Sequence, residues 1–313
     1  MLTVPLLQRL ETARTVLISG CGGGFDVYCG VPFISGLLAA GKQVVLNGLS
    51  FTPLPRSGAE HIDGALWRID RRSAEIPYFP EKWLCEWLGH QDIDVPVYAV
   101  QQTGAEPIRQ AYARLCADHA VDLVLLVDGG TDSLIFGDEP GLGTVAEDAA
   151  SVVAAEAAAP GKVVLAAIGF GIDHHHGVSH HAFLENTATL IRDGAFLGRV
   201  PLGPQSAEAE AFLSLIDYAN QRQPAHMSIV CNSIASAIRG EFGDFHATSR
   251  TRGSQLFINP LMLDYWAFAA TPLVRRMVYA EQVLATRTIG EINFVIEEAR
   301  RNIILRARQP IPL

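Results

Sequence analysis

The sequence contains few cysteines, and no two of them are spaced as CxxC. The five cysteines stand alone, at positions 21, 29, 85, 116 and 231. Disulfide-stabilised domains depend on paired cysteines, so an odd and scattered set excludes a disulfide framework. The pattern indicates buried thiols in a reducing compartment.

The sequence also lacks a surplus of basic residues and a long apolar run. Its 24 lysines and arginines are outnumbered by 33 acidic residues, which gives a formal net charge of −9. This charge opposes binding to nucleic acid or to an anionic membrane, because both are polyanions. No uncharged apolar stretch reaches the roughly 18 residues of a membrane span, and the N-terminus does not resemble a signal peptide. We therefore expect a cytoplasmic protein that has neither nucleic acid nor membrane as a partner.

The common nucleotide-binding signatures are missing as well. The dinucleotide pattern GxGxxG fails because Phe25 occupies its third glycine position, and the Walker pattern GxxxxGK is absent. The acidic residue expected after the second strand is replaced by Asn47. The looser pattern GxGxG fits Gly20, Gly22 and Gly24 and resembles that of methyltransferases that use S-adenosylmethionine.

Apolar residues are abundant and occur in short, β-branched runs. They make up 49% of the chain, enough for a large core. Strands are predicted at 15–19, 43–48, 95–100, 121–128, 162–169 and 227–232. Helices are predicted at 26–40, 105–119, 144–159, 179–193 and 205–222. Runs without polar alternation are covered on both faces, so we predict an α/β fold: a doubly wound, Rossmann-like, mostly parallel sheet with helices on both faces.

The chain is predicted to form a single domain over residues 1–313, with two departures from the alternating pattern. Residues at about 50–94 contain four prolines and predict an insertion or lid. Residues at about 255–313 contain helical patterns at 271–285 and 289–303 and predict a C-terminal helical extension. This extension would pack against the sheet edge or against a partner subunit, which leaves a homo-oligomer open.

Glycine-rich, acidic and histidine-rich segments follow five of the six predicted strands. In an open parallel sheet, the carboxyl ends of the strands lie at one edge, and ligands bind in the crevice at that edge. We therefore predict the binding site there.

The segment after the first strand, "GCGGGFD" at 20–26, predicts a ligand-binding loop. Gly22, Gly23 and Gly24 can expose backbone N–H groups, and the following helix adds its positive end, which favours an anion. Asp26 would repel a bare phosphate, so it either caps the helix or contacts a hydroxyl, an ammonium or a metal. These residues and Asn47 are assigned to ligand binding.

The segment after the fourth strand, "VDGGTDSLIFGDEPGLG", is acidic. Carboxyl groups held close together have split pKa values, so one can act as an acid while another acts as a base. Mg²⁺ or Ca²⁺ would also accept such a set. Asp128 and Asp132 are assigned to catalysis, Glu139 to ligand binding and Asp138 to a structural turn.

The segment after the fifth strand, "IGFGIDHHHGVSHH" at 168–181, holds five of the ten histidines. Ser179 is predicted to cap a helix, which places His180 in the first turn and favours a neutral imidazole. His176 and His180 are assigned to catalysis, and Asp173 and Ser179 to ligand binding. Asp173, His176 and His180 also offer three zinc ligands, but the HExxH pattern is absent. An inert surface loop is the third interpretation.

Three residues farther along the chain complete the predicted ligand-binding set. Asn186 lies two turns beyond Ser179 on the same predicted helix, Asn232 follows the sixth strand, and Arg250 is one of three arginines within 239–252. Arginine suits phosphate or carboxylate groups, although plain surface ion pairs are an equal alternative.

Four ordered motifs, "GGGFDV", "DGGTDSLIFGDEPGL", "IGFGIDHHHGVSHH" and "LEN", resemble a prokaryotic α/β family known as domain of unknown function number eleven fifty-two. The resemblance spans most of the chain. The matching residues are Gly22, Gly23, Gly24, Asp26, Asp128, Gly130, Asp132, Asp138, Glu139, Asp173, His176, Gly177, Ser179, His180, Glu185 and Asn186. His174 and His175 have no fixed counterpart, Phe25 replaces a glycine, and Thr131 interrupts the second motif. The resemblance implies the fold and no particular chemistry.

We expect an enzyme, a hydrolase or transferase, that acts on a small polar, anionic metabolite such as a nucleoside-like, sugar-phosphate-like or amide compound. Asp132 and His176 would exchange protons with the substrate, aided by Asp128 and His180, and the glycine loop would bind the anionic group. No cofactor is assigned, and a divalent metal is a secondary alternative. The other two hypotheses are an S-adenosylmethionine-dependent transferase and a non-catalytic metabolite sensor or subunit.

Overall fold

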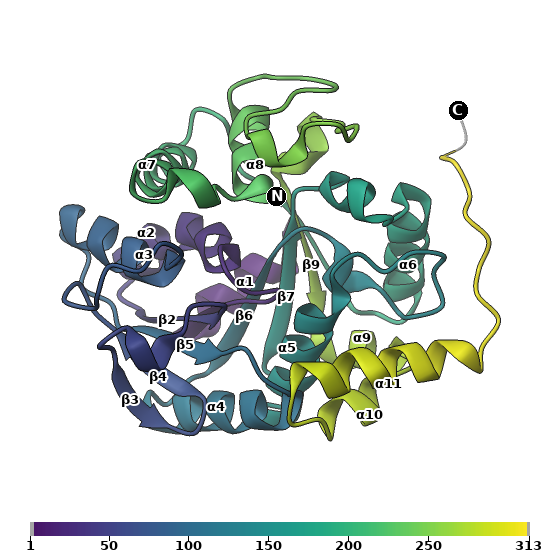
Figure 1. The fold of residues 1–313 in the computed structure, drawn as a ribbon, viewed down its shortest axis with the longest axis horizontal. Helices are drawn as coiled ribbons and strands as arrows, with labels where there is room; N and C mark the ends of the chain where they lie inside the picture. Colours follow the sequence, from purple (N-terminus) through teal and green to yellow (C-terminus); the bar gives the residue numbers. More distant parts are fainter. Residues whose placement is uncertain (1–2, 312–313) are drawn as a thin grey trace.

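A mixed β-sheet forms the centre of the structure. The computed structural model describes residues 3–311, apart from the side chain of His175, and within them nine strands lie in the order β3-β4-β5-β2-β1-β6-β7-β9-β8 (Figure 1). The middle strands β5, β2, β1, β6 and β7 are parallel, and antiparallel pairings add two strands at each edge. The strands are β1 (Thr15–Gly20), β2 (Gln43–Ser50), β3 (Glu60–Asp63), β4 (Leu66–Ile69), β5 (Val97–Gln101), β6 (Leu123–Gly129), β7 (Val163–Ile168), β8 (Phe196–Pro201) and β9 (Asp264–Ala269).

Helices cover both faces of the sheet (Figure 1). One face carries α1 (Pro5–Thr12), α2 (Val31–Ala39), α3 (Pro80–His90), α7 (Ala207–Arg222) and α8 (Ile229–Ile238). The other carries α4 (Ala105–Asp118), α5 (Val145–Ala158), α6 (His180–Arg192), α9 (Ala270–Arg276), α10 (Ala280–Leu284) and α11 (Ile289–Arg301). The prediction of an α/β fold with helices on both faces is confirmed. None of the helices within residues 3–311 combines the length and apolar character needed to cross a membrane.

Two hydrophobic cores lie on opposite faces of the central strands. In β1, Val16 and Ile18 pack into the core beneath α2 and α7, whereas Leu17 packs into the core beneath α4 and α5. Every residue of β1 is buried, as expected for a strand between two helical layers. The cysteines are free thiols, and all except Cys116 are fully buried.

The sequence prediction of a strand at 227–232 is wrong, because this stretch begins helix α8. Ser228 caps the helix by accepting a hydrogen bond from the Cys231 N–H at 3.1 Å. The apolar run continues to Ile238, and an apolar run alone does not distinguish a buried strand from a buried helix. The strand beside β7 is instead β9, so the C-terminal region is helical only from α9 onward.

Residues 50–94 extend the sheet, and Phe51 and Tyr78 of this segment line the cleft described below. β3 and β4 form an antiparallel pair, and β4 joins the edge of β5. Phe51 and Tyr78 from this segment pack against each other with ring centroids 6.3 Å apart.

Candidate active site

A polar cleft opens at the carboxyl edge of the parallel strands, near the ends of β1 and β6. The sheet order reverses between these two strands, because β2 and β5 lie on one side of β1 while β6 and β7 lie on the other. Such a reversal separates the flanking loops and leaves a crevice for a ligand. The cleft has a volume of about 280 Å³. Eight predicted site residues line it: Gly22, Gly23, Asp26, Asp128, Asp132, Asp173, His176 and Arg250.

The glycine-rich segment after β1 turns the chain so that Asp26 enters the cleft. Gly23 has a φ of +99°, a left-handed conformation that favours glycine. At Gly22, a Cβ atom would lie 2.7–2.8 Å from carboxylate oxygens of Asp148 and Asp26. The Gly22 N–H donates to Asp26 Oδ2 at 2.6 Å. This N–H group of the glycine-rich loop therefore binds the Asp26 carboxylate of the same chain.

Asp128 and Asp132 come from the end of β6 and from the 3₁₀ helix η3 (Asp132–Leu134). Asp128 Oδ2 accepts hydrogen bonds from the hydroxyl and the N–H of Ser133. Asp132 Oδ2 accepts from the N–H and the hydroxyl of Thr144, both at 2.8 Å. The two aspartates are 1% and 3% exposed, respectively. Their orientation is thus fixed by the protein before any ligand binds.

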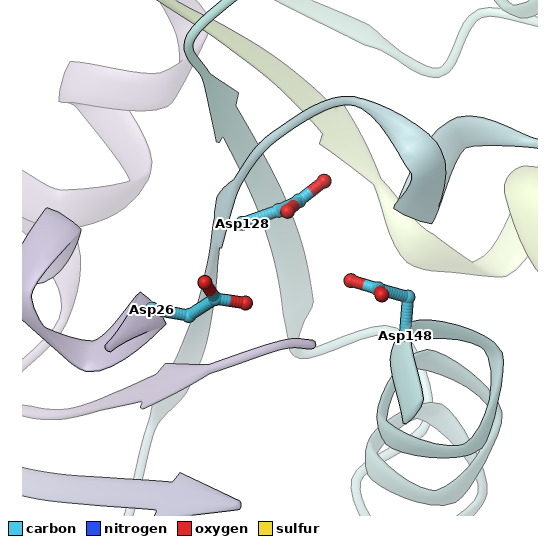
Figure 2. Close-up of side chains that lie close together, drawn as sticks. All are labelled: Asp26, Asp128 and Asp148. Atoms are coloured by element: carbon cyan, nitrogen blue, oxygen red, sulfur yellow. The ribbon is translucent and has the colours of Figure 1, made fainter. Parts of the chain in front are cut away.

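Two further aspartates complete the acidic wall. Asp173 lies on the 3₁₀ helix η4 (Ile172–His176), where its Oδ2 accepts from the Thr131 N–H at 2.6 Å. Asp148 lies in the first turn of α5 and is 2% exposed. Its Oδ1 makes no hydrogen bond with a described residue. Figure 2 shows the carboxyl groups of Asp26 and Asp148 pointing toward each other near Asp128.

Burial raises the pKa values of the cleft aspartates above their ordinary range. This direction holds for Asp26, Asp128, Asp132, Asp148 and Asp173. Repulsion between neighbouring carboxylates raises the pKa values of Asp128 and Asp148 further. The His176 imidazole acts in the opposite direction and partly offsets the rise in the pKa of Asp132. The carboxyl groups of the cleft therefore favour bound protons or a bound cation.

Two basic side chains lie at the exposed side of the cleft. His176 is on η4, and Arg250 is on the 3₁₀ helix η6 (Ser249–Thr251), in the segment that follows α8. Arg250 Nη1 donates to the Met227 carbonyl at 3.0 Å, which ties this segment to the start of α8. The cleft thus combines an acidic interior with a basic rim.

The remaining seven predicted site residues lie outside the cleft: Gly24, Asn47, Glu139, Ser179, His180, Asn186 and Asn232. Asn47 is buried between strands, where its Nδ2 donates to Ser19 Oγ at 2.9 Å. Asn232 exchanges hydrogen bonds with Asn220 on α7. The Gly24 N–H donates to a carbonyl of the second strand. Ser179 caps α6, which confirms its predicted place in the fold.

His180 lies at the start of α6, on the side of the C-terminal segment. Its ring stacks on that of His174 with centroids 4.9 Å apart, and burial lowers the pKa of His180. Among the described residues, the one set of ligand atoms that converges as a metal site would require is that of Asp26, Asp128 and Asp148. In the described part of the chain, the zinc set of Asp173, His176 and His180 considered from the sequence does not converge in this way.

Glu139 and Asn186 bind an arginine of the C-terminal segment. Arg306 Nη2 donates to Glu139 Oε1 and to Asn186 Oδ1, both at 2.8 Å. The same guanidinium pairs with Asp138 and Glu185. Figure 1 shows this segment running past α6 on the outside of the molecule. Residues assigned to an external ligand thus hold part of the chain itself.

Replacing Arg306 by alanine is expected to destabilise the fold. Glu139 is fully buried and would lose its only cationic partner among the described residues. Breaking a buried pair costs about 3–5 kcal/mol, and because Arg306 remains 24% exposed we expect a loss of about 2 kcal/mol. Urea unfolding measures this loss. Arg308→Ala is the control, since Arg308 is exposed; equal stability of the two variants would contradict the prediction.

Asp148 and its neighbour Glu147 are the cleft acids that sequence analysis missed. They lie in the first turn of an alanine-rich helix, where acidic residues are common because they suit the helix dipole. The one unusual feature is that Asp148 is buried, which a single sequence does not reveal. Asp148 lies far in sequence from the glycine-rich segment at 20–26 and meets it only in the folded chain.

Comparisons with known proteins place the chain in one family. No curated protein and no solved structure matches it. Residues 55–302 match a family described as "Protein of unknown function (DUF1152)", and this range covers most of the chain and most of the cleft residues. The resemblance to this family is therefore confirmed, with three of the four motifs inside the matched range, and the chain belongs to the DUF1152 family.

Proposed function

We propose that the chain is a cytoplasmic enzyme that hydrolyses, or transfers a group from, a small polar metabolite carrying an anionic group. The observation that carries this proposal is the cleft at the strand ends, in which two groups suited to proton exchange lie together. Thr144 fixes Asp132 within it, and His176 lies close enough to affect the pKa of Asp132. A carboxyl group and an imidazole held in one cleft are a common pair of proton acceptor and donor.

The anionic group of the substrate binds at the rim of the cleft. Arg250 and His176 lie there, whereas the interior carries carboxyl groups. The Gly22 N–H already donates to Asp26, so Gly22 contributes less to anion binding than its sequence suggests. The substrate therefore enters with its reacting group toward Asp132 and its negative charge toward Arg250.

The cleft gives no specific support to an S-adenosylmethionine-dependent transferase. Asn47, which stands in place of the acidic residue expected after the second strand, is buried and hydrogen-bonded to Ser19. A non-catalytic sensor would use the same cleft, and only turnover distinguishes it from an enzyme.

The test is a substrate survey with purified protein. Phosphate esters, N-glycosides and carboxamides of small anionic metabolites are incubated with the protein, and released phosphate, base or ammonia is measured. We expect turnover of one class. If compounds of the survey raise the melting temperature of the protein and none of them is turned over, the protein is a sensor and the proposed enzyme is refuted.

A further inference from the structure

Three aspartates from distant parts of the chain place their oxygens at one point of the cleft. Asp26 comes from the 3₁₀ helix η1 (Asp26–Gly30), Asp128 from β6 and Asp148 from α5. One oxygen from each lies within 4.8 Å of the other two. No lysine or arginine forms an ion pair with any of the three in the described part of the chain. The cluster thus carries negative charge without a counter-charge of its own.

Asp148 is the observation that points to a ligand. Its side chain is almost fully buried, and its Oδ1 has no hydrogen-bond donor among the described residues. The carboxyl group faces Asp26 across the cluster (Figure 2). Buried polar groups normally have hydrogen-bond partners, so a buried polar group without one indicates that an ion or a water molecule binds there.

The floor of the cluster is shaped to leave the carboxylates free to approach one another. A Cβ atom at Gly22 would lie 2.7 Å from Asp148 Oδ2 and 2.8 Å from Asp26 Oδ2. Any side chain there would separate the two groups or fill the space between them. Glycine at this position therefore keeps a small, oxygen-lined space open.

We propose that Asp26, Asp128 and Asp148 bind a hard divalent cation of the Mg²⁺ or Mn²⁺ type. Oxygen ligands alone favour such cations over zinc, which prefers nitrogen and sulfur. A Mg²⁺–oxygen distance of about 2.1 Å sets ligand oxygens about 3–4 Å apart, and the longer Ca²⁺–oxygen distance of about 2.4 Å allows about 5 Å. The oxygens of the three aspartates lie within 4.8 Å of one another, which is compatible with this range.

A bound cation would also explain how an anion enters an acidic cleft. It neutralises the carboxylates and offers a positive charge to a substrate oxygen beside Asp132. This catalytic part rests on the proposed function, whereas cation binding itself does not. The two are separated by measuring cation binding without substrate.

The experiment is a calorimetric titration of the metal-free, full-length chain with MgCl₂, MnCl₂ and CaCl₂, with Mn²⁺ binding followed by electron paramagnetic resonance. We expect one site per chain for at least one of these ions. Asp148→Asn should weaken binding by at least about tenfold, because it removes a direct ligand charge. Gly22→Ala should weaken it as well, although it keeps all three carboxylates. Asp118→Asn, the same substitution on the exposed end of α4, should leave the affinity unchanged.

A thermal-unfolding series guards against misfolded variants. Asp148→Asn replaces a buried carboxyl group whose Oδ1 has no hydrogen-bond donor among the described residues, so without metal it should melt no lower than the unchanged chain, and Mn²⁺ should no longer raise its melting temperature. Absence of binding by all three ions, or equal affinity in Asp148→Asn and Asp118→Asn, would overturn the proposal. Cation binding without turnover of any substrate would leave the metal site standing and would count against the proposed enzyme.

Discussion

Asp132→Asn is expected to lower kcat by about 10²- to 10⁴-fold, the usual contribution of a general acid or base. The asparagine oxygen can still accept the hydrogen bonds of Thr144, so the side chain stays in place while its proton-transfer ability is lost. KM should change much less, because the anionic group of the substrate binds at Arg250. Steady-state kinetics on the substrate found in the survey measures both constants.

The control for this substitution is Asp118→Asn, which changes the same charge outside the cleft and should leave kcat intact. Circular dichroism and thermal unfolding establish that the Asp132 variant is folded. If kcat of Asp132→Asn stayed within about threefold of the unchanged enzyme, Asp132 would not exchange a proton in the slow step, and the assignment would be withdrawn.

Glu81→Gln is expected to remove a large pH dependence of stability. Glu81 is fully buried at the start of α3, against Gly48 of β2, and neither of its oxygens makes a hydrogen bond of good geometry with a described residue. Burial raises the pKa of Glu81 from 4.5 to about 7, although the nearby Ser50 hydroxyl acts against this rise. In the folded chain, this group is therefore largely protonated at pH 6 and about half protonated at pH 7.

The direction of the effect follows from the two pKa values. Below pH 4.5, the group is protonated in both the folded and the unfolded chain and adds no pH dependence. Between pH 4.5 and about 7, the unfolded chain releases the proton first, so the folded chain loses stability as the pH rises, by about 3 kcal/mol in all. Above this window, both forms are ionised and the loss is complete.

Urea unfolding at pH 4.5, 6 and 8 tests this expectation. The free energy of unfolding of Glu81→Gln, relative to that of the unchanged chain, should grow by about 3 kcal/mol from pH 4.5 to 8. The other buried acids are present in both proteins, so their contribution cancels in the difference. Glu75→Gln, at an exposed position, should show no such growth. A difference that does not vary with pH would mean that Glu81 is ionised in the folded chain.

The position of the cleft was predictable from local sequence. Buried strands followed by Gly22, Asp128 and Asp173 imply loops at one sheet edge, because parallel strands all end there. The structure brings these loops together around one cleft. The prediction depends only on the rule that parallel strands end at one edge of the sheet, and it requires no knowledge of the ligand.

Other parts required tertiary structure. The apolar segment at 227–232 fits a buried strand as well as a buried helix, and only its continuation beneath α7 selects the helix. Glu139 is an acidic residue on a promising loop, yet its partner Arg306 lies more than 160 residues away and approaches from the C-terminal segment. Asp148 has an ordinary helical context. In each case, contacts with residues far away in the sequence determine the role of the segment or residue. A local sequence pattern does not reveal such contacts.

The placement of β1 bears on how truncated forms of this protein should be designed. This strand pairs on both sides, with β2 and with β6, yet it precedes the range 55–302 that matches the family. A recombinant fragment trimmed to that range would split the sheet down its middle and leave Glu139 without Arg306. A fragment boundary upstream of Thr15 and a second one beyond Arg306 are therefore the minimum for a foldable unit.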